Sequence, residues 1–195
     1  MHSGRGTYTR VDEDQATLQN RAELEAVLGR PSGLGPVFAR HAYGMGRWVD
    51  LFAARLASIG EPEIAAIVAG IVSDNARHLT LFRERALALG VDPDAYVCPP
   101  EGAAIYEPIR ELRTDELLGY ALGSLEHFAE LLAVYGEFAS GVDGEVIAAV
   151  RINNERTISR LTELVGEAEE RVRAEAHERY RRRELAETQL YAHGS

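Results

Sequence analysis

The chain contains no lysine, so all 21 of its basic residues are arginine. Without a lysine amine the protein cannot form a Schiff base with pyridoxal phosphate, and a phosphate-binding P-loop is excluded as well. Cysteine is almost absent, since Cys98 is the single one. One cysteine excludes an internal disulfide and a thiolate zinc or iron–sulfur site built by one chain. Six histidines and 31 acidic residues leave imidazole and carboxylate metal sites open.

Positive net charge and long apolar runs are missing too. The formal net charge of −10 repels nucleic acid phosphates and anionic membranes, so we expect neither as a partner. The longest apolar run, residues 64–72, is too short to cross a bilayer, and no secretory signal is visible. We therefore expect a cytoplasmic protein, and 195 residues suit one domain with a sizeable core.

Helical periodicity dominates the sequence, and no strand pattern rises above noise. Apolar residues recur every three or four positions in four long stretches. We predict helices over residues 36–59, 62–89, 114–139 and 145–165. Short turns at Gly60 and at residues 141–144 make two antiparallel hairpins. The turn-rich segment 91–113 is long enough to carry the chain from one end of the bundle to the other.

Three further segments flank these helices. Residues 1–14 have no periodicity and are predicted to be disordered, and residues 15–29 are predicted to form a short helix. Residues 166–195 are highly charged and favour a helix, either as a continuation of the fourth helix or as a separate solvated one. The predicted domain therefore covers residues 15–165, with a charged helical extension after it.

Two motifs occur at comparable depth in the second helix of each hairpin, Asp74-Asn75-Ala76-Arg77-His78 and Asn154-Glu155-Arg156-Thr157-Ile158. With the long crossover, they make the chain resemble the ferritin-like diiron-carboxylate superfamily, which includes rubrerythrin and bacterioferritin. That family has one Glu on the first helix of each hairpin and Glu-x-x-His on the second. The resemblance implies an all-α, ferritin-like four-helix bundle over residues 36–165, and a homodimer by analogy with members that dimerise.

The sequence departs from the family pattern at three positions, where His41, Asn75 and Ile158 replace two Glu and one His. His78 and Glu155 match the pattern by residue type. Two imidazoles and a carboxylate suit a mononuclear site for iron, manganese or zinc better than a pair of irons. The predicted metal ligands are His41, His78, Glu126 and Glu155, where Glu126 is the best candidate on the third helix.

Three functions are compatible with this pattern. The first is a redox enzyme that acts on a small organic substrate, with His78, Glu126 and Glu155 as catalytic residues and iron or manganese as the cofactor. The second is a metal-free relative in which a His or Glu acts as general acid or base, as in an isomerase, cyclase or lyase. The third is a bundle whose polar interior is only structural and whose function is association. Iron storage is not expected, because it needs the paired site.

Each candidate residue also has a structural interpretation. His41 and His78 can be hydrogen-bonded core histidines, Glu155 can pair with an arginine, and Glu126 can be solvated. His127 falls opposite the apolar stripe of its helix and is predicted to lie on the surface. Four glycines either leave room for an organic ligand or let two helices approach closely. These are Gly44, Gly46, Gly119 and Gly123.

Overall fold

The protein is all-α. The computed structural model describes residues 22, 25–26, 28–29 and 33–193, and these contain helices and turns without a strand. The segment predicted to be disordered, residues 1–14, lies outside the described residues. Most of the short helix predicted over residues 15–29 lies outside them as well, although residues 22, 25–26 and 28 are helical.

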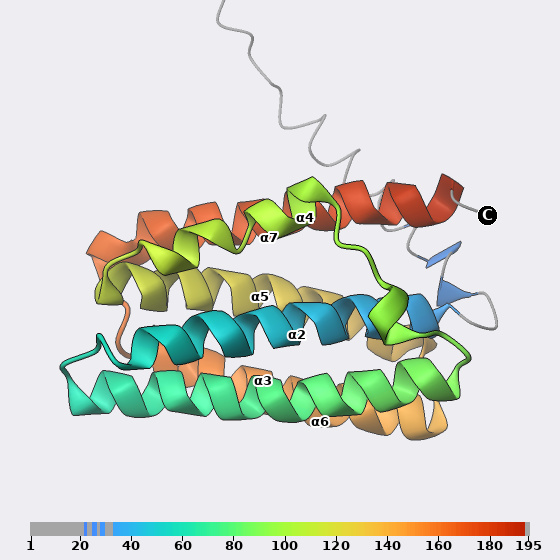
Figure 1. The fold of residues 1–195 in the computed structure, drawn as a ribbon, viewed down its shortest axis with the longest axis horizontal. Helices are drawn as coiled ribbons and strands as arrows, with labels where there is room; N and C mark the ends of the chain where they lie inside the picture. The colour runs from blue at the N-terminus through green and yellow to red at the C-terminus, as the bar shows by residue number, and fades with distance from the viewer. Residues whose placement is uncertain (1–21, 23–24, 27, 30–32, 194–195) are drawn as a thin grey trace, which may run out of the picture.

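The described residues form six α-helices, which pack in pairs (Figure 1), and three short 3-10 turns. The four predicted long helices are present, each within a few residues of its expected bounds. The α-helices are α2 (Leu34–Leu56), α3 (Pro62–Ala88), α4 (Pro100–Ala104), α5 (Thr114–Phe138), α6 (Gly141–Thr162) and α7 (Glu170–His193). The 3-10 turns are η1 (Pro93–Ala95), η2 (Glu107–Arg110) and η3 (Glu167–Glu169).

Two hairpins, α2–α3 and α5–α6, form the predicted pairs. Pro62 is the first residue of α3, where its missing N–H costs nothing. Gly141 has a φ of +55°, which a residue without a side chain adopts easily and which permits the sharp turn into α6. The hairpins meet where α3 and α6 run antiparallel, and the ion pair between Arg85 and Asp143 (2.6 Å) joins them.

The connection between the hairpins runs back along the bundle, and its α4 packs against α7 (Figure 1). It is anchored by apolar side chains, since Ile105, Tyr106 and Ile109 are all buried. Arg55 of α2 also donates a hydrogen bond to the carbonyl oxygen of Ile109 (2.8 Å). The long segment is therefore a packed part of the fold.

The C-terminal helix α7 is separate from α6 and packs against α5, to which it runs parallel (Figure 1). The prediction of a solvated extension is wrong for this helix, because Val172 and Ala176 are buried in the core. Arg40 of α2 forms a 2.6 Å ion pair with Glu184, and the two side chains are only 3% and 5% exposed. α7 is therefore a fifth long helix of the bundle.

Two glycines of α5 allow this packing. A Cβ atom on Gly123 would lie 2.0 Å from the carbonyl oxygen of Arg173, and one on Gly119 would lie 2.9 Å from that of Glu169. Both distances are shorter than any real contact of a Cβ atom. At these two positions the glycine allows close packing of the backbones. Of the two predicted roles, room for an organic ligand or close approach of helices, the structure shows the second.

α5 is the central helix and contributes side chains to both apolar clusters of the core. One cluster surrounds Trp48 and Phe52, and the other surrounds Phe38 and Phe82. By length and composition α5 could cross a membrane, but 72% of that apolar stretch is buried inside the protein. Its apolar character is therefore accounted for by packing within the bundle.

Substitution of Gly123 by alanine tests the contact between α5 and α7. We expect Gly123→Ala to lower the free energy of unfolding by about 3 kcal/mol or more, because the new methyl group must push α7 away. The matched control is Gly136→Ala on the same helix, where a Cβ atom would meet nothing within 4 Å. This control should raise the free energy of unfolding by about 0.5–1 kcal/mol. Equal effects of the two substitutions in urea denaturation would contradict the contact.

Candidate functional site

The two carboxylates predicted as metal ligands point away from a common site. Glu126 of α5 forms a 2.5 Å ion pair with Arg173 of α7. Glu155 of α6 is 61% exposed and lies 3.5 Å from Arg151 on its own helix. Each carboxylate therefore has an arginine partner, and the two partners lie on different helices.

The two histidines predicted as ligands have separate environments as well. His41 of α2 accepts a 2.8 Å hydrogen bond at Nε2 from Arg40, and the hydroxyl of Tyr135 lies 3.0 Å from the same atom. His78 of α3 is buried, and its Nε2 lies 3.3 Å from the side-chain amide of Asn153. Burial lowers the pKa of His78 to about 4, so the ring is neutral at pH 7.

The inward-facing residues of α6 are Asn154 and Thr157, one position before the predicted Glu155 and Ile158. With Asn75 and His78 of α3 they line a small cavity of about 20 Å³. Asn75 and Asn154 are neutral amides, and each donates a hydrogen bond to a backbone carbonyl oxygen. Asp74, the carboxylate at this cavity, is held by Arg77 and Arg156. These residues do not fit the pair of metal ions that the resemblance implies.

A different group of donors converges where α5 and α7 pack together. The group, which we name the His–Glu–His triad, consists of His127 and Glu130 on α5 and His177 on α7. One ligand atom from each side chain lies within 4.8 Å of the other two. Nε2 of His177 is 3.0 Å from the Glu130 carboxylate, and Nδ1 of His127 is 3.6 Å from it. The imidazoles of His127 and His177 lower the pKa of Glu130, which keeps it ionised.

Local helix geometry explains the triad. His127 and Glu130 are three residues apart, so they share one face of α5. The parallel packing of α7 at Gly123 brings His177 next to them, with the two imidazole rings 5.5 Å apart. Two imidazoles and one carboxylate are a common donor set for mononuclear iron, manganese and zinc.

His127 is the residue whose position was predicted wrongly from the sequence. It is 4% exposed rather than on the surface, because α7 covers the face of α5 that carries it. Among the described residues neither of its ring nitrogens has a hydrogen-bond partner. A buried polar group without a partner costs about 1–3 kcal/mol, so this ring is suited to a metal or a ligand. The apolar spacing of Val172 and Ala176 is the sequence signal that could have shown this face to be covered.

A cavity of about 50 Å³ lies on the inner side of His127, between α2, α5, α7 and the connection between the hairpins. It lies where the two apolar clusters of the core meet. The side chains of its apolar wall are Met45, Trp48, Leu125, Phe128 and Leu131. Its polar groups include Arg40, His41, Asn75, Ser124, His127, Arg183 and Glu184.

A hydrogen-bonded network forms the polar end of this cavity. Arg40 pairs with Glu184 and also donates to the hydroxyl of Tyr135 (3.0 Å), which in turn lies 3.4 Å from the Glu184 carboxylate. Burial and the positive charges of Arg40 and Arg183 lower the pKa of His41 well below its usual value. His41 is therefore a neutral acceptor at pH 7, in agreement with the hydrogen bond that it takes from Arg40.

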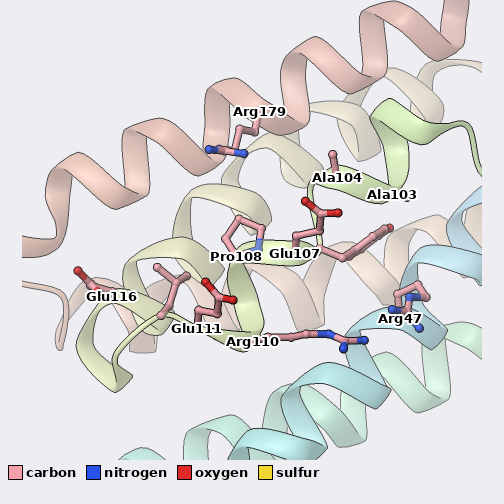
Figure 2. A pocket seen from close by; sticks show the side chains of 11 residues that line it. Arg47, Ala103, Ala104, Glu107, Pro108, Arg110, Glu111, Glu116 and Arg179 are labelled. Atoms are coloured by element: carbon pink, nitrogen blue, oxygen red, sulfur yellow. The ribbon is translucent and has the colours of Figure 1, made fainter.

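The surface also contains an open groove of about 840 Å³ (Figure 2). It lies between Arg47 of α2, Arg179 of α7 and the segment that contains η2. Its charged side chains are of both signs, with three arginines and three glutamates. Most of these groups are solvated, so the groove lacks the convergent buried groups that the triad and the interior cavity provide.

Comparisons with protein-family models, with curated proteins and with solved structures find no match to this chain. The described residues form an all-α bundle in which His127, Glu130 and His177 could hold a metal ion.

The pH dependence of stability tests the environment of His78. Its folded-state pKa of about 4 lies below the ordinary 6.5, so only the unfolded chain binds a proton between these values. We expect the wild-type protein to lose up to about 3 kcal/mol of unfolding free energy through His78 as the pH falls from 6.5 to 4. The control is His78→Gln, and the difference between the two proteins should shrink over this range. A difference that stays constant with pH would contradict the assignment.

The Arg40–Glu184 pair can be tested against the exposed Glu155. We expect Glu184→Gln to lower the free energy of unfolding by about 3 kcal/mol, because it removes the carboxylate beside a buried guanidinium. Glu155→Gln should change it by less than about 0.5 kcal/mol, because an exposed ion pair is screened by water. Urea denaturation of both variants at pH 7 measures the contrast, and similar values would mean that the Glu184 carboxylate is solvated.

Proposed function

We propose that the protein binds one divalent transition-metal ion, iron or manganese, through His127, Glu130 and His177, and that it is an oxidoreductase acting on a small organic molecule. The observation that carries the proposal is the convergence of three donors on a buried histidine whose ring nitrogens have no hydrogen-bond partner in the described structure. A metal ion bound at Nδ1 of His127 would offset part of the free-energy cost of burying a ring nitrogen without a hydrogen-bond partner.

The donor set supports redox chemistry. Three protein ligands leave coordination positions open for a substrate or dioxygen, and such sites are typical of non-haem iron oxygenases. Glu130 and His177 are on the solvent side, with side chains 62% and 30% exposed, so the site is accessible from outside. His127 connects the same site to the interior cavity.

The arrangement of two hairpins and a long connection supports the resemblance to ferritin-like proteins. In this proposal, however, the metal lies between α5 and α7 rather than inside the four hairpin helices. Asn75 and Asn154 account for the shift, because each is a neutral amide that donates to a backbone carbonyl oxygen, so neither position offers a carboxylate.

A metal-free acid–base enzyme is the second candidate, and the interior cavity favours it. His41 is neutral and lines the cavity beside the buried Glu184. A neutral imidazole in such a place can act as a general base toward a small ligand.

Metal binding by purified, tag-free protein tests the first candidate. We expect about one Mn²⁺ or Fe²⁺ per chain by elemental analysis after anaerobic loading. His177→Ala and Glu130→Gln should weaken binding by at least about 100-fold, since each removes one of three ligands. His78→Ala is the matched control and should bind as the wild type does. Iron-loaded wild type should also consume dioxygen faster than an equal amount of iron bound to Glu130→Gln.

Two results would contradict the proposal. One is the absence of bound metal after loading, which would leave the metal-free candidate. The other is metal that survives His177→Ala but is lost in His78→Ala, which would place the site inside the hairpin helices.

A further inference from the structure

A groove of about 300 Å³, which we name the α3–α6 groove, lies at the surface where these two helices meet. Its charged lining consists of Asp74 and Arg77 of α3 and of Arg156 and Arg160 of α6. Residues three or four positions apart share one face of a helix, so each helix presents its two charged residues together. Three guanidinium groups and one carboxylate give the lining a net formal charge of +2, on a chain whose net charge is −10. An anion that most of the chain repels is therefore attracted to this groove.

Asp74 holds two of these arginines in place and leaves most of their donors free. Its carboxylate is 13% exposed, and it accepts from Nη2 of Arg77 at Oδ1 and from Nη2 of Arg156 at Oδ2 (3.3 Å). The same Nη2 of Arg156 also donates to the side-chain oxygen of Asn153 (3.0 Å). A guanidinium group has five N–H donors on three nitrogens. Nε and Nη1 of both arginines have no partner among the described residues, so they are left for a ligand.

Arg160 adds a third guanidinium group that the fold does not use. Its side chain is exposed and makes neither a hydrogen bond nor an ion pair in the part of the chain that the structure describes. Since it lines the same groove, it brings a further charge and five more N–H donors to the anion site. Its loss would therefore weaken a bound anion without removing a polar contact of the folded protein.

The charge and the number of donors favour a phosphate group over a carboxylate. A carboxylate has one negative charge and two oxygens, which a single guanidinium group satisfies in a bidentate pair. A phosphate monoester carries nearly two negative charges at pH 7 and offers three oxygens as strong acceptors. It therefore matches the net charge of the lining and can accept from more than one arginine at a time.

The α3–α6 groove has room for more than the phosphate group. Its volume is at the lower end of the range of pockets that bind small organic molecules. Ile67 and Ile71 line it beside the charged groups, and a Cβ atom on Gly70 would meet nothing within 4 Å, so the space above Gly70 is open. We propose that this groove binds a phosphate monoester of a small organic molecule, whose phosphate group is held by the three arginines of the lining. The inference is independent of the proposed metal site, to which none of these residues belongs.

Calorimetric titration of the full-length, metal-free protein tests the proposal, with inorganic phosphate and phenyl phosphate as the probes. Both are titrated at pH 7 and at constant ionic strength, so that general screening stays the same. We expect saturable binding of both probes, with phenyl phosphate at least about threefold tighter because its ring covers apolar surface in the groove. The absence of saturable binding would overturn the inference.

Two arginines of α6 make a matched pair of variants. Arg160→Gln and Arg151→Gln each remove one positive charge from the same helix, but Arg151 does not line the groove and lies 3.5 Å from Glu155. We expect Arg160→Gln to weaken the binding of both probes at least about fivefold, because it removes charge-assisted hydrogen bonds. Arg151→Gln should change it by less than about twofold, since a distant exposed charge is screened. Equal weakening by the two variants would mean general attraction and would overturn the inference.

A variant of Gly70 tests the place of the organic group. Gly70→Leu keeps every charge of the lining and fills the open space beside it. We expect this variant to weaken phenyl phosphate more than inorganic phosphate. If phenyl phosphate bound to Gly70→Leu as tightly as to the wild type, its ring would lie outside the groove, and the proposal of an organic monoester would be wrong.

A last measurement uses the wild-type protein alone. In a chain labelled with nitrogen-15 arginine, phenyl phosphate should shift the Nε–H resonances of Arg77, Arg156 and Arg160. Arg110 and Arg179 line the larger open groove of Figure 2, and their resonances should stay in place. Shifts confined to Arg110 and Arg179 would move the anion to that groove and overturn the inference.

Discussion

The close approach of α7 to α5 is the contact on which the rest of the structure depends. Gly123 lets the backbones of α5 and α7 touch, and Gly119 allows the same close approach to η3, directly before α7. A helix held so closely has little freedom to slide or rotate. Because the helices run parallel, this contact fixes the register of every later residue of α7. It brings His177 to His127 and Glu184 to Arg40, so the triad and the polar end of the cavity result from one packing constraint.

Polar groups set the remaining details of this interface. α7 is rich in charge and offers few apolar side chains, so its inner face uses hydrogen bonds and ion pairs in addition to burial. A buried ion pair such as Arg40–Glu184 adds little net stability compared with apolar packing. It does penalise any other register, since a shift of α7 would leave two buried charges unpaired. We therefore interpret this pair as a determinant of specificity in the docking of α7.

Periodicity and turn residues were enough to predict the long helices and the segment between the hairpins. The packing of α7 could not be predicted in this way, because the apolar residues of its inner face, such as Val172, Ala176 and Tyr180, are few among its many charged residues. The candidate site was missed for the same reason, since His127 is on the surface of α5 unless α7 covers it. On α6 the inward residue was misassigned by one position. One residue rotates a side chain by about 100° around a helix, which is enough to put Glu155 in solvent and Asn154 in the core.

The interior of the bundle has two polar regions, and they differ in the charge of their buried groups. Between α3 and α6 the fully buried groups are neutral: the amides of Asn75 and Asn154 each donate to a backbone carbonyl oxygen, although Oδ1 of Asn154 has no hydrogen-bond partner among the described residues. Between α2, α5 and α7 the buried groups are charged, and they are stable only where a partner of opposite charge is held in place. Chemistry in this protein is therefore expected around α7, where the fold retains buried charge and an imidazole without a hydrogen-bond partner among the described residues.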